Sequence, residues 1–141
     1  MFAPAIRKSR AFTLVELIVI IVVLAILSGV AIPKYIDYTA NAKSSACKAT
    51  LGAVRTAISN SYANSALTGT PAFPTLVQMQ TLGTVMQENL PNNPYNNSNV
   101  IAAATWAATP PTAGVNGWNY DATAGRFWAN SNTAGIGENA W

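Results

Sequence analysis

The sequence predicts an α+β protein in which a long N-terminal helix packs, through its second half, on a small antiparallel β-sheet head. Three observations lead to this prediction. An unbroken apolar segment lies near the N-terminus, a helical apolar period follows it to about residue 66, and short strand-like segments occur in a Pro-, Asn-, Thr- and Gly-rich region after residue 70. The length of 141 residues allows one small domain, or one domain with an anchor.

The residue inventory argues against most enzyme classes. The chain holds no His and 1 Cys, which excludes an intramolecular disulfide, a Cys/His zinc cluster and a nucleophilic site with His as its base. The carboxylates are scattered along the chain, at Glu16, Asp37, Glu88, Asp121 and Glu138. We therefore expect a protein that is not an enzyme.

The net charge of +3 belongs to the first residues of the chain. Arg7, Lys8 and Arg10 are 3 of the 8 basic side chains, so 5 basic residues balance the 5 acidic residues in the remainder. Nucleic-acid binding through a general basic surface needs clustered Lys and Arg, and beyond residue 11 they are spread thinly. Nucleic acid is not an expected partner.

The most informative segment is the apolar one at residues 12–32. Its 21 residues are enough, as a helix, to cross a hydrocarbon core of about 30 Å. The basic residues before it predict a cytoplasmic leader and an external remainder. An ordinary signal peptide cut near Gly29-Val30-Ala31 and an uncut signal anchor both fit this pattern. Neither gives a role to Glu16, which costs about 2.5–3.5 kcal/mol inside a bilayer.

Residues 10–17, Arg-Ala-Phe-Thr-Leu-Val-Glu-Leu, resemble the processing signal of the type IV pilin superfamily, which includes the pseudopilins of type II secretion systems. In that family a membrane peptidase cuts before the Phe and methylates the new amino group. The resemblance implies a cut between Ala11 and Phe12 and N-methylation of Phe12, with Glu16 as the family's acidic position. Ala11 departs from the usual Gly, and Pro33 lies where the family commonly has a kinking proline.

The resemblance also implies a domain plan and partners. It divides the chain into a leader peptide at 1–11 removed by a prepilin peptidase, a transmembrane and filament-core helix at 12–33, an amphipathic second helical half at 34–67 and a head at 68–141. The implied partners are other copies of the chain in a homopolymeric filament, the prepilin peptidase/methyltransferase, an assembly ATPase and an inner-membrane platform protein. The implied location is the inner (cytoplasmic) membrane, single-pass with the head outside the cytoplasm, and then a periplasmic or extracellular filament.

Elementary electrostatics predicts a role for Glu16 in such a filament. The cut creates a charged amine at Phe12, which can meet the Glu16 carboxylate of a neighbouring subunit. Opposite charges about 4 Å apart attract by about 4 kcal/mol at an effective dielectric constant near 20. Glu16 is therefore the expected assembly carboxylate.

Beyond Pro33 the apolar residues recur at three- and four-residue steps, which predicts a continued helix with one apolar stripe. The helix should end near Ala66, before the stop signals at residues 68–71. Gly29 and Pro33 are the expected kink positions. The stripe consists of Ile36, Ala40, Cys47, Leu51, Val54, Ile58 and Tyr62, and its Cys is interpreted as a small core residue.

The head is expected to hold one short helix and three or four antiparallel strands. The helix lies within residues 74–82 and is capped by Thr75. The strand candidates are residues 100–106, 117–120 and 126–129, of which the last two flank a hairpin loop at 121–125. Trp118 and Tyr120 share one face of their strand and are expected to pack on the long helix.

The head sequence also resembles, more loosely, the C-terminal part of major pseudopilins. The matching segments are 90–95, 117–121 and 125–127, and they slightly favour a secretion pseudopilin over a surface pilin. Since major pseudopilins can bind calcium in this region, Asp121 and Glu138 are candidate oxygen ligands. The competing interpretation makes Asp121 an ordinary hairpin residue. No other cofactor is expected.

A second function class remains open from the sequence. A secreted or membrane-anchored binding domain, behind an ordinary signal peptide or anchor, would use exposed aromatic side chains to engage a carbohydrate or another surface. Its candidates are Trp106, Trp118, Trp128 and Trp141.

Overall fold

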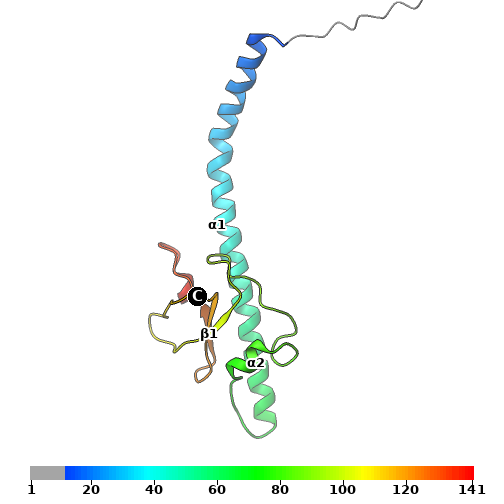
Figure 1. The fold of residues 1–141 in the computed structure, drawn as a ribbon, viewed down its shortest axis with the longest axis vertical. Coiled ribbons are helices and arrows are strands. Elements are labelled where there is room, and N and C mark those ends of the chain that lie inside the picture. Colours follow the sequence, from blue (N-terminus) through cyan, green and yellow to red (C-terminus); the bar gives the residue numbers. More distant parts are fainter. Residues whose placement is uncertain (1–11) are drawn as a thin grey trace, which may run out of the picture. The chain divides into compact units, whose positions relative to one another are not determined.

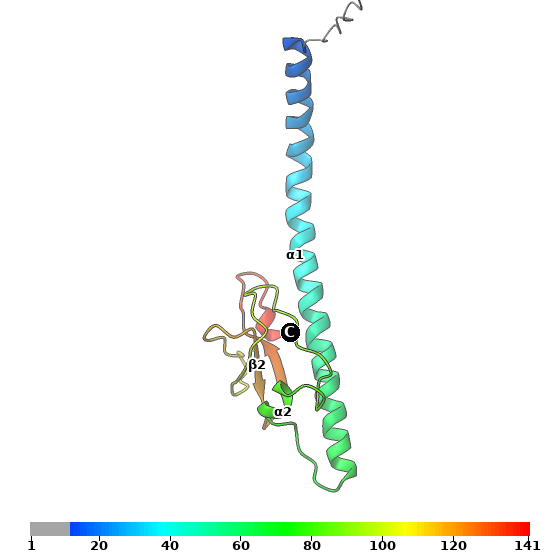
Figure 2. The same ribbon diagram turned by 45° about the vertical axis from the view of Figure 1, so that its right-hand side comes forward.

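The computed structural model describes residues 12–141, so the expected leader at 1–11, with Ala11, lies outside the described residues. The chain divides after Thr39 into two units. The ribbon in Figures 1 and 2 shows a helical N-terminal segment and a C-terminal unit of short strands, loops and helix.

Helix α1 (Leu14–Leu67) has defined signals at both ends. At its start, the backbone N–H of Glu16 donates to Thr13 Oγ1 at 3.2 Å, a side-chain N-cap. At its end, the N–H of Thr70 donates to the carbonyl of Ser65 and that of Gly69 donates to the carbonyl of Ala66, both at 3.2 Å. These two bonds form a Schellman motif around the positive φ of +84° at Gly69. The stop signals expected after residue 67 are confirmed.

The helix continues through Pro33. The proline ring lacks an N–H group, so one helical hydrogen bond is missing at this point. The expected kink at Gly29 and Pro33 stays a prediction.

The second unit, Ala40–Trp141, contains the later half of α1 and the whole head. Its further elements are α2 (Leu76–Gln80), β1 (Ile101–Ala103), β2 (Trp118–Asp121), β3 (Arg126–Ala129) and the 3₁₀ helix η1 (Glu138–Ala140). The short helix α2 begins at the predicted cap: Gln78 N–H donates to Thr75 Oγ1 at 3.3 Å, and Thr75 N–H donates to Gln78 Oε1 at 2.8 Å. This is a complete capping box.

The sheet has the order β1-β2-β3 and is mixed. Strands β2 and β3 are antiparallel, as expected, and join in a hairpin. Strand β1 pairs with β2 in parallel, so the prediction of a wholly antiparallel sheet is wrong at β1. The physical reason is the connection at residues 104–117, which crosses one face of the sheet instead of turning back on itself. Its Pro111 carbonyl accepts hydrogen bonds from Asn119 Nδ2 at 3.0 Å and Trp128 Nε1 at 2.9 Å.

Strand β1 is also shorter than predicted. The last ladder bond of its edge runs from Ala104 N–H to the carbonyl of Tyr120 at 3.1 Å. Two residues later, the N–H of Trp106 donates to the Asp121 side chain at 2.8 Å instead of to a strand carbonyl. The chain therefore leaves the sheet before residue 106.

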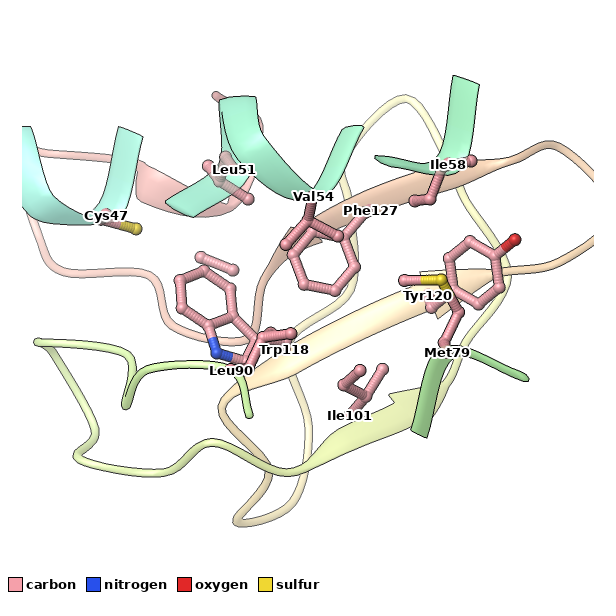
Figure 3. Packing of buried hydrophobic residues seen from close by; sticks show 11 residues of the cluster. Cys47, Leu51, Val54, Ile58, Met79, Leu90, Ile101, Trp118, Tyr120 and Phe127 are labelled. Carbon is pink, nitrogen blue, oxygen red and sulfur yellow. The ribbon is translucent and has the colours of Figure 1, made fainter. Parts of the chain in front are cut away.

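The core of the second unit lies between α1 and the opposite face of the sheet (Figure 3). Trp118 and Tyr120 of β2, with Phe127 of β3, turn toward the apolar stripe of α1. The stripe residues buried there are Cys47, Leu51, Val54 and Ile58. The predicted packing of β2 on the long helix is thus confirmed, as is the core position of the cysteine, whose side chain is 0% exposed.

Candidate functional site

The first unit presents an apolar helix that no other part of residues 12–141 covers. The large apolar side chains from residue 12 to residue 36 each keep 42–72% of their surface exposed. The most apolar 18-residue window has a mean hydropathy of 3.0, with none of it buried. Length and composition allow this helix to cross a membrane, although a signal sequence has the same two properties. A helix that is apolar on all sides needs a membrane or other helices around it.

Glu16 lies in the first turn of this helix. Its backbone N–H is satisfied by Thr13 Oγ1, while its side chain is exposed. The helix dipole places partial positive charge at this end, which favours a carboxylate there. The side chain is therefore accessible to a cation from outside the helix.

The role of Thr13 as the helix cap was missed in the sequence analysis. The signal was present, because Thr13-Leu14-Val15-Glu16 has the Ser/Thr-x-x-Glu spacing of a capping box. Only the half donated by the Glu16 N–H forms in the structure. Phe12, the predicted new N-terminus, precedes this cap and is 66% exposed.

The two candidate calcium ligands are engaged within the head. Asp121 Oδ1 accepts hydrogen bonds from Thr123 Oγ1 at 2.5 Å, Thr123 N–H at 2.9 Å and Ala124 N–H at 3.2 Å. Its Oδ2 accepts from Trp106 N–H. The bonds from Thr123 and Trp106 lower the pKa of Asp121 to about 2. The Asp121 side chain thus caps the hairpin loop and binds the connection between β1 and β2 at residues 104–117.

Glu138 is 0% exposed and forms a separate cluster. Both of its carboxylate oxygens accept from Thr133 N–H at 2.9 Å, and Oε1 also accepts from Thr133 Oγ1 at 2.7 Å. Burial acts to raise the pKa of Glu138, but hydrogen bonds from Thr133, from Ser131 and from the Glu138 backbone together outweigh it and leave the pKa below its usual range. Within residues 12–141 the structure brings together no group of three or more His, Cys, Asp or Glu side chains suited to a metal.

The tryptophans do not form the exposed aromatic surface of the alternative function. Trp118 and Trp128 are 0% exposed. Trp106 packs edge-on against Trp128, with a centroid distance of 5.3 Å, and Trp141 is half-buried under the ammonium group of Lys48 at 4.4 Å. These rings serve the packing of the head.

A second feature missed from the sequence is the contact that Arg55 makes from α1. Its Nε and Nη2 donate to the carbonyl of Phe127 at 3.1 and 2.9 Å, and Nη2 also donates to the Trp141 oxygen. This guanidinium covers the free edge of β3 and fixes the last residues of the sequence against the helix. No local sequence signal identifies it, because its acceptors lie 72 and 86 residues away.

The comparison with known protein families agrees with the geometry of the first unit. Residues 6–32 match the family model described as the prokaryotic N-terminal methylation motif. The chain carries this motif. It ends at residue 32, next to Pro33, and includes Phe12, Thr13 and Glu16.

Relatives of the chain are named as type IV pilus proteins and as a fimbrial protein. It is 40% identical over 50 residues to the type IV major pilin protein PilA of Myxococcus xanthus and to the type IV narrow pilus major component PilA5 of Thermus thermophilus. It is 35% identical over 51 residues to a fimbrial protein of Pseudomonas aeruginosa. Each alignment covers 36% of this chain, and they cover 23%, 43% and 33% of the three relatives. No solved structure matches significantly.

Proposed function

We propose that the chain is a structural, non-catalytic subunit of a type IV pilin-like filament. The observation that carries the proposal is the uncovered apolar segment at residues 12–36, whose helix begins at Leu14 with a cap beside Glu16 and which overlaps the methylation motif at residues 6–32. In the membrane this segment anchors the subunit, and in the filament the same segment packs against its counterparts. The head of residues 68–141 is carried outside the cytoplasm.

Proteolytic processing prepares the helix for packing in the filament. A prepilin peptidase cuts between Ala11 and Phe12 and methylates the Phe12 amine. The cut removes Arg7, Lys8 and Arg10, which hold the leader in the cytoplasm. An assembly ATPase and an inner-membrane platform protein then extract the subunit from the inner membrane.

Glu16 selects the assembled state. Its accessible carboxylate pairs with the Phe12 amine of a neighbouring subunit, where the attraction is about 4 kcal/mol at an effective dielectric constant of 20. Removing one partner of a poorly solvated ion pair leaves an uncompensated charge, which is costly. The pair therefore favours one register between neighbouring helices.

The test replaces the carboxylate while keeping its size. Glu16→Gln should give a membrane-inserted protein that is processed at Phe12 but forms no filaments. Asp37→Asn, which neutralises another exposed carboxylate of the first unit, is the matched control and should assemble normally. The readouts are N-terminal peptide mass and the filament content of sheared cell fractions. Normal filaments from Glu16→Gln would overturn the pairing, whereas unprocessed Glu16→Gln protein would place the role of Glu16 in peptidase recognition.

The kind of filament is a separate question. The names of the relatives favour a surface pilus, while the loose resemblance of the head favours a secretion pseudopilus. Deletion of the chain distinguishes them. Loss of long filaments outside the cell would support a pilus, and failed export of secreted enzymes with no loss of surface filaments would support a pseudopilus.

A further inference from the structure

The uncharged part of α1 has the length of a bilayer's hydrocarbon core. Residues 17–33 carry no acidic or basic side chain, and Glu16 and Lys34 bound this stretch of 17 residues. That length is at the lower end of the range for a helix that spans a membrane. At 1.5 Å per residue the two charged residues lie about 27 Å apart along the helix, close to the thickness of about 30 Å of a hydrocarbon core. Glu16 and Lys34 therefore mark the two ends of the span.

The far end of this span carries side chains that suit a membrane interface. Lys34, Tyr35 and Tyr38 lie on one side of α1 within about one turn, because residues three and four apart are neighbours on a helix. The tyrosines are 70% and 67% exposed, and Lys34 is exposed. Tyrosine combines an apolar ring with a hydroxyl group, and lysine combines an apolar stem with an ammonium group. Both therefore favour the boundary between lipid chains and headgroups, and we call these three residues the outer belt.

The direction of helical side chains brings the outer belt to one level. Each Cα–Cβ bond of a helix tilts toward the N-terminus, so Tyr38 covers the turn that precedes it, at the level of Lys34. At this end of the span the tilt leads back toward the hydrocarbon core, which suits the tyrosine rings. At the other end the same tilt leads away from the core, so the Glu16 carboxylate reaches toward headgroups and water. Glu16 thereby avoids the cost of a charge inside the bilayer.

We propose that the outer belt binds phospholipid headgroups of the leaflet on the side away from the leader, with the Lys34 ammonium group on a lipid phosphate. Lipid is the partner that fits, because the phosphate supplies an anion and the acyl chains supply apolar contact on the same side of the helix. This inference rests on the membrane-anchored state of the proposed function. It gives that state a register in which residues 17–33 span the membrane, fewer than the expected 12–33. Glu16 then stays hydrated until assembly brings it the Phe12 amine of a neighbour.

The depth of spin labels tests the register. Val15→Cys, Leu24→Cys and Ile36→Cys are made one at a time in the full-length chain, labelled with a nitroxide and reconstituted into vesicles of phosphatidylethanolamine and phosphatidylglycerol. Relaxation by oxygen and by a water-soluble nickel complex should place the label at residue 24 near the bilayer centre and the labels at residues 15 and 36 at headgroup level. The unsubstituted chain should take up no label, because Cys47 is 0% exposed. A label at residue 15 inside the hydrocarbon core, or a label at residue 36 in bulk water, overturns this register.

Lipid phosphorus tests the contact itself. In the same vesicles, solid-state NMR of the chain with isotope-labelled lysine measures the dephasing of ammonium nitrogen signals by lipid phosphorus. Lys34→Gln should remove a dephased signal, whereas Lys43→Gln, at an exposed position farther along α1, should leave it in place. With labelled tyrosine, Tyr38→Phe should remove a dephased ring signal, and Tyr62→Phe, at an exposed tyrosine of the second unit, should not. Unchanged dephasing in Lys34→Gln, or equal losses in Lys34→Gln and Lys43→Gln, overturns the proposal.

The labels also separate this inference from the proposed function. A helix that crosses the vesicle membrane in another register, in a chain that forms normal filaments in cells, overturns the outer belt and leaves the filament subunit standing. Labels in bulk water at all three positions would mean that the chain has no membrane-anchored state, and the proposed function would fail with the belt.

Discussion

Single charged residues of the second unit hold together segments that are distant in the sequence. Arg55 joins α1 to β3 and to the end of the chain, and Asp121 joins the hairpin loop to the connection at residues 104–117. Asp121 accepts with both of its carboxylate oxygens, and Arg55 donates from Nε and Nη2. These charged side chains therefore stabilise the fold, and we expect their replacement to lower the free energy of unfolding.

The carboxylate of Asp121 should make the head sensitive to acid. Its pKa is about 2 in the folded protein against a usual value of 3.8, so its ionised form stabilises the fold above pH 3.8 and this contribution is lost as the pH falls to about 2. Asp121→Asn should lower the free energy of unfolding at pH 7 by about 1 kcal/mol. It should also make the free energy of unfolding fall less between pH 3.8 and about 2. Glu88→Gln, an exposed carboxylate of the same unit, is the control. Urea unfolding of the detergent-solubilised chain at several pH values measures both effects, and parallel pH profiles for the parent and Asp121→Asn would contradict this role.

Arg55 should not be replaceable by lysine. A lysine keeps the charge but offers no planar fork for the Phe127 carbonyl and the Trp141 oxygen. We expect Arg55→Lys to lower the free energy of unfolding by about 1–3 kcal/mol and to speed amide exchange in residues 138–141. Lys43→Met, at an exposed position of α1, should change neither. Equal stability of Arg55→Lys and the parent would show that the fork contributes little.

At the level of elements, local signals predicted helix ends better than strand directions. The start of α2 at Thr75 and the end of α1 after Leu67 could be predicted from the sequence. The hydrogen bonds that cap a helix reach only a few residues along the chain, so their partners are close in sequence. The parallel pairing of β1 depends instead on Asn119 and Trp128 binding a loop that crosses the sheet. Such bonds join partners that no short-range pattern connects. The contact of Arg55 was unpredictable for the same reason.

Gly52 within α1 and Gly69 just after its end should respond to alanine with opposite signs. Gly69 has a φ of +84° and Gly52 has an ordinary helical backbone, and an added Cβ meets nothing within 4 Å at either position. Gly69→Ala should therefore destabilise the unit by about 1 kcal/mol through backbone strain alone. Gly52→Ala should stabilise it by about 0.5–1 kcal/mol because alanine favours the helix. Thermal unfolding of both variants measures this, and the same sign for both would contradict the Schellman ending.

For the whole molecule, the sequence already separates an apolar N-terminal segment from a second unit with its own core, to which α1 and the head both contribute. The pattern at residues 10–17 predicted the methylation motif, and the stripe from Cys47 to Ile58 predicted the core face of α1. The candidate assembly residues Phe12 and Glu16 rest on that pattern alone, since their partners belong to other copies of the chain. What the sequence could not supply was the contact that joins Arg55 to the Phe127 carbonyl and the Trp141 oxygen.

Processing should leave a physical signature on the whole chain. Removal of residues 1–11 takes 3 of the 8 basic side chains, so the formal net charge falls from +3 to 0 and the isoelectric point moves toward neutrality. Intact-mass and N-terminal peptide mass spectrometry of membrane-extracted protein should find a chain that starts at Phe12 with one added methyl group. A chain that starts near Ile32 would instead mean an ordinary exported domain without the apolar helix, and Glu16 would have no role in the mature protein. A full-length, unmethylated chain would mean a signal anchor, in which the three cations stay in place to hold the N-terminus in the cytoplasm. Only the Phe12 terminus supplies the amine that the Glu16 carboxylate needs.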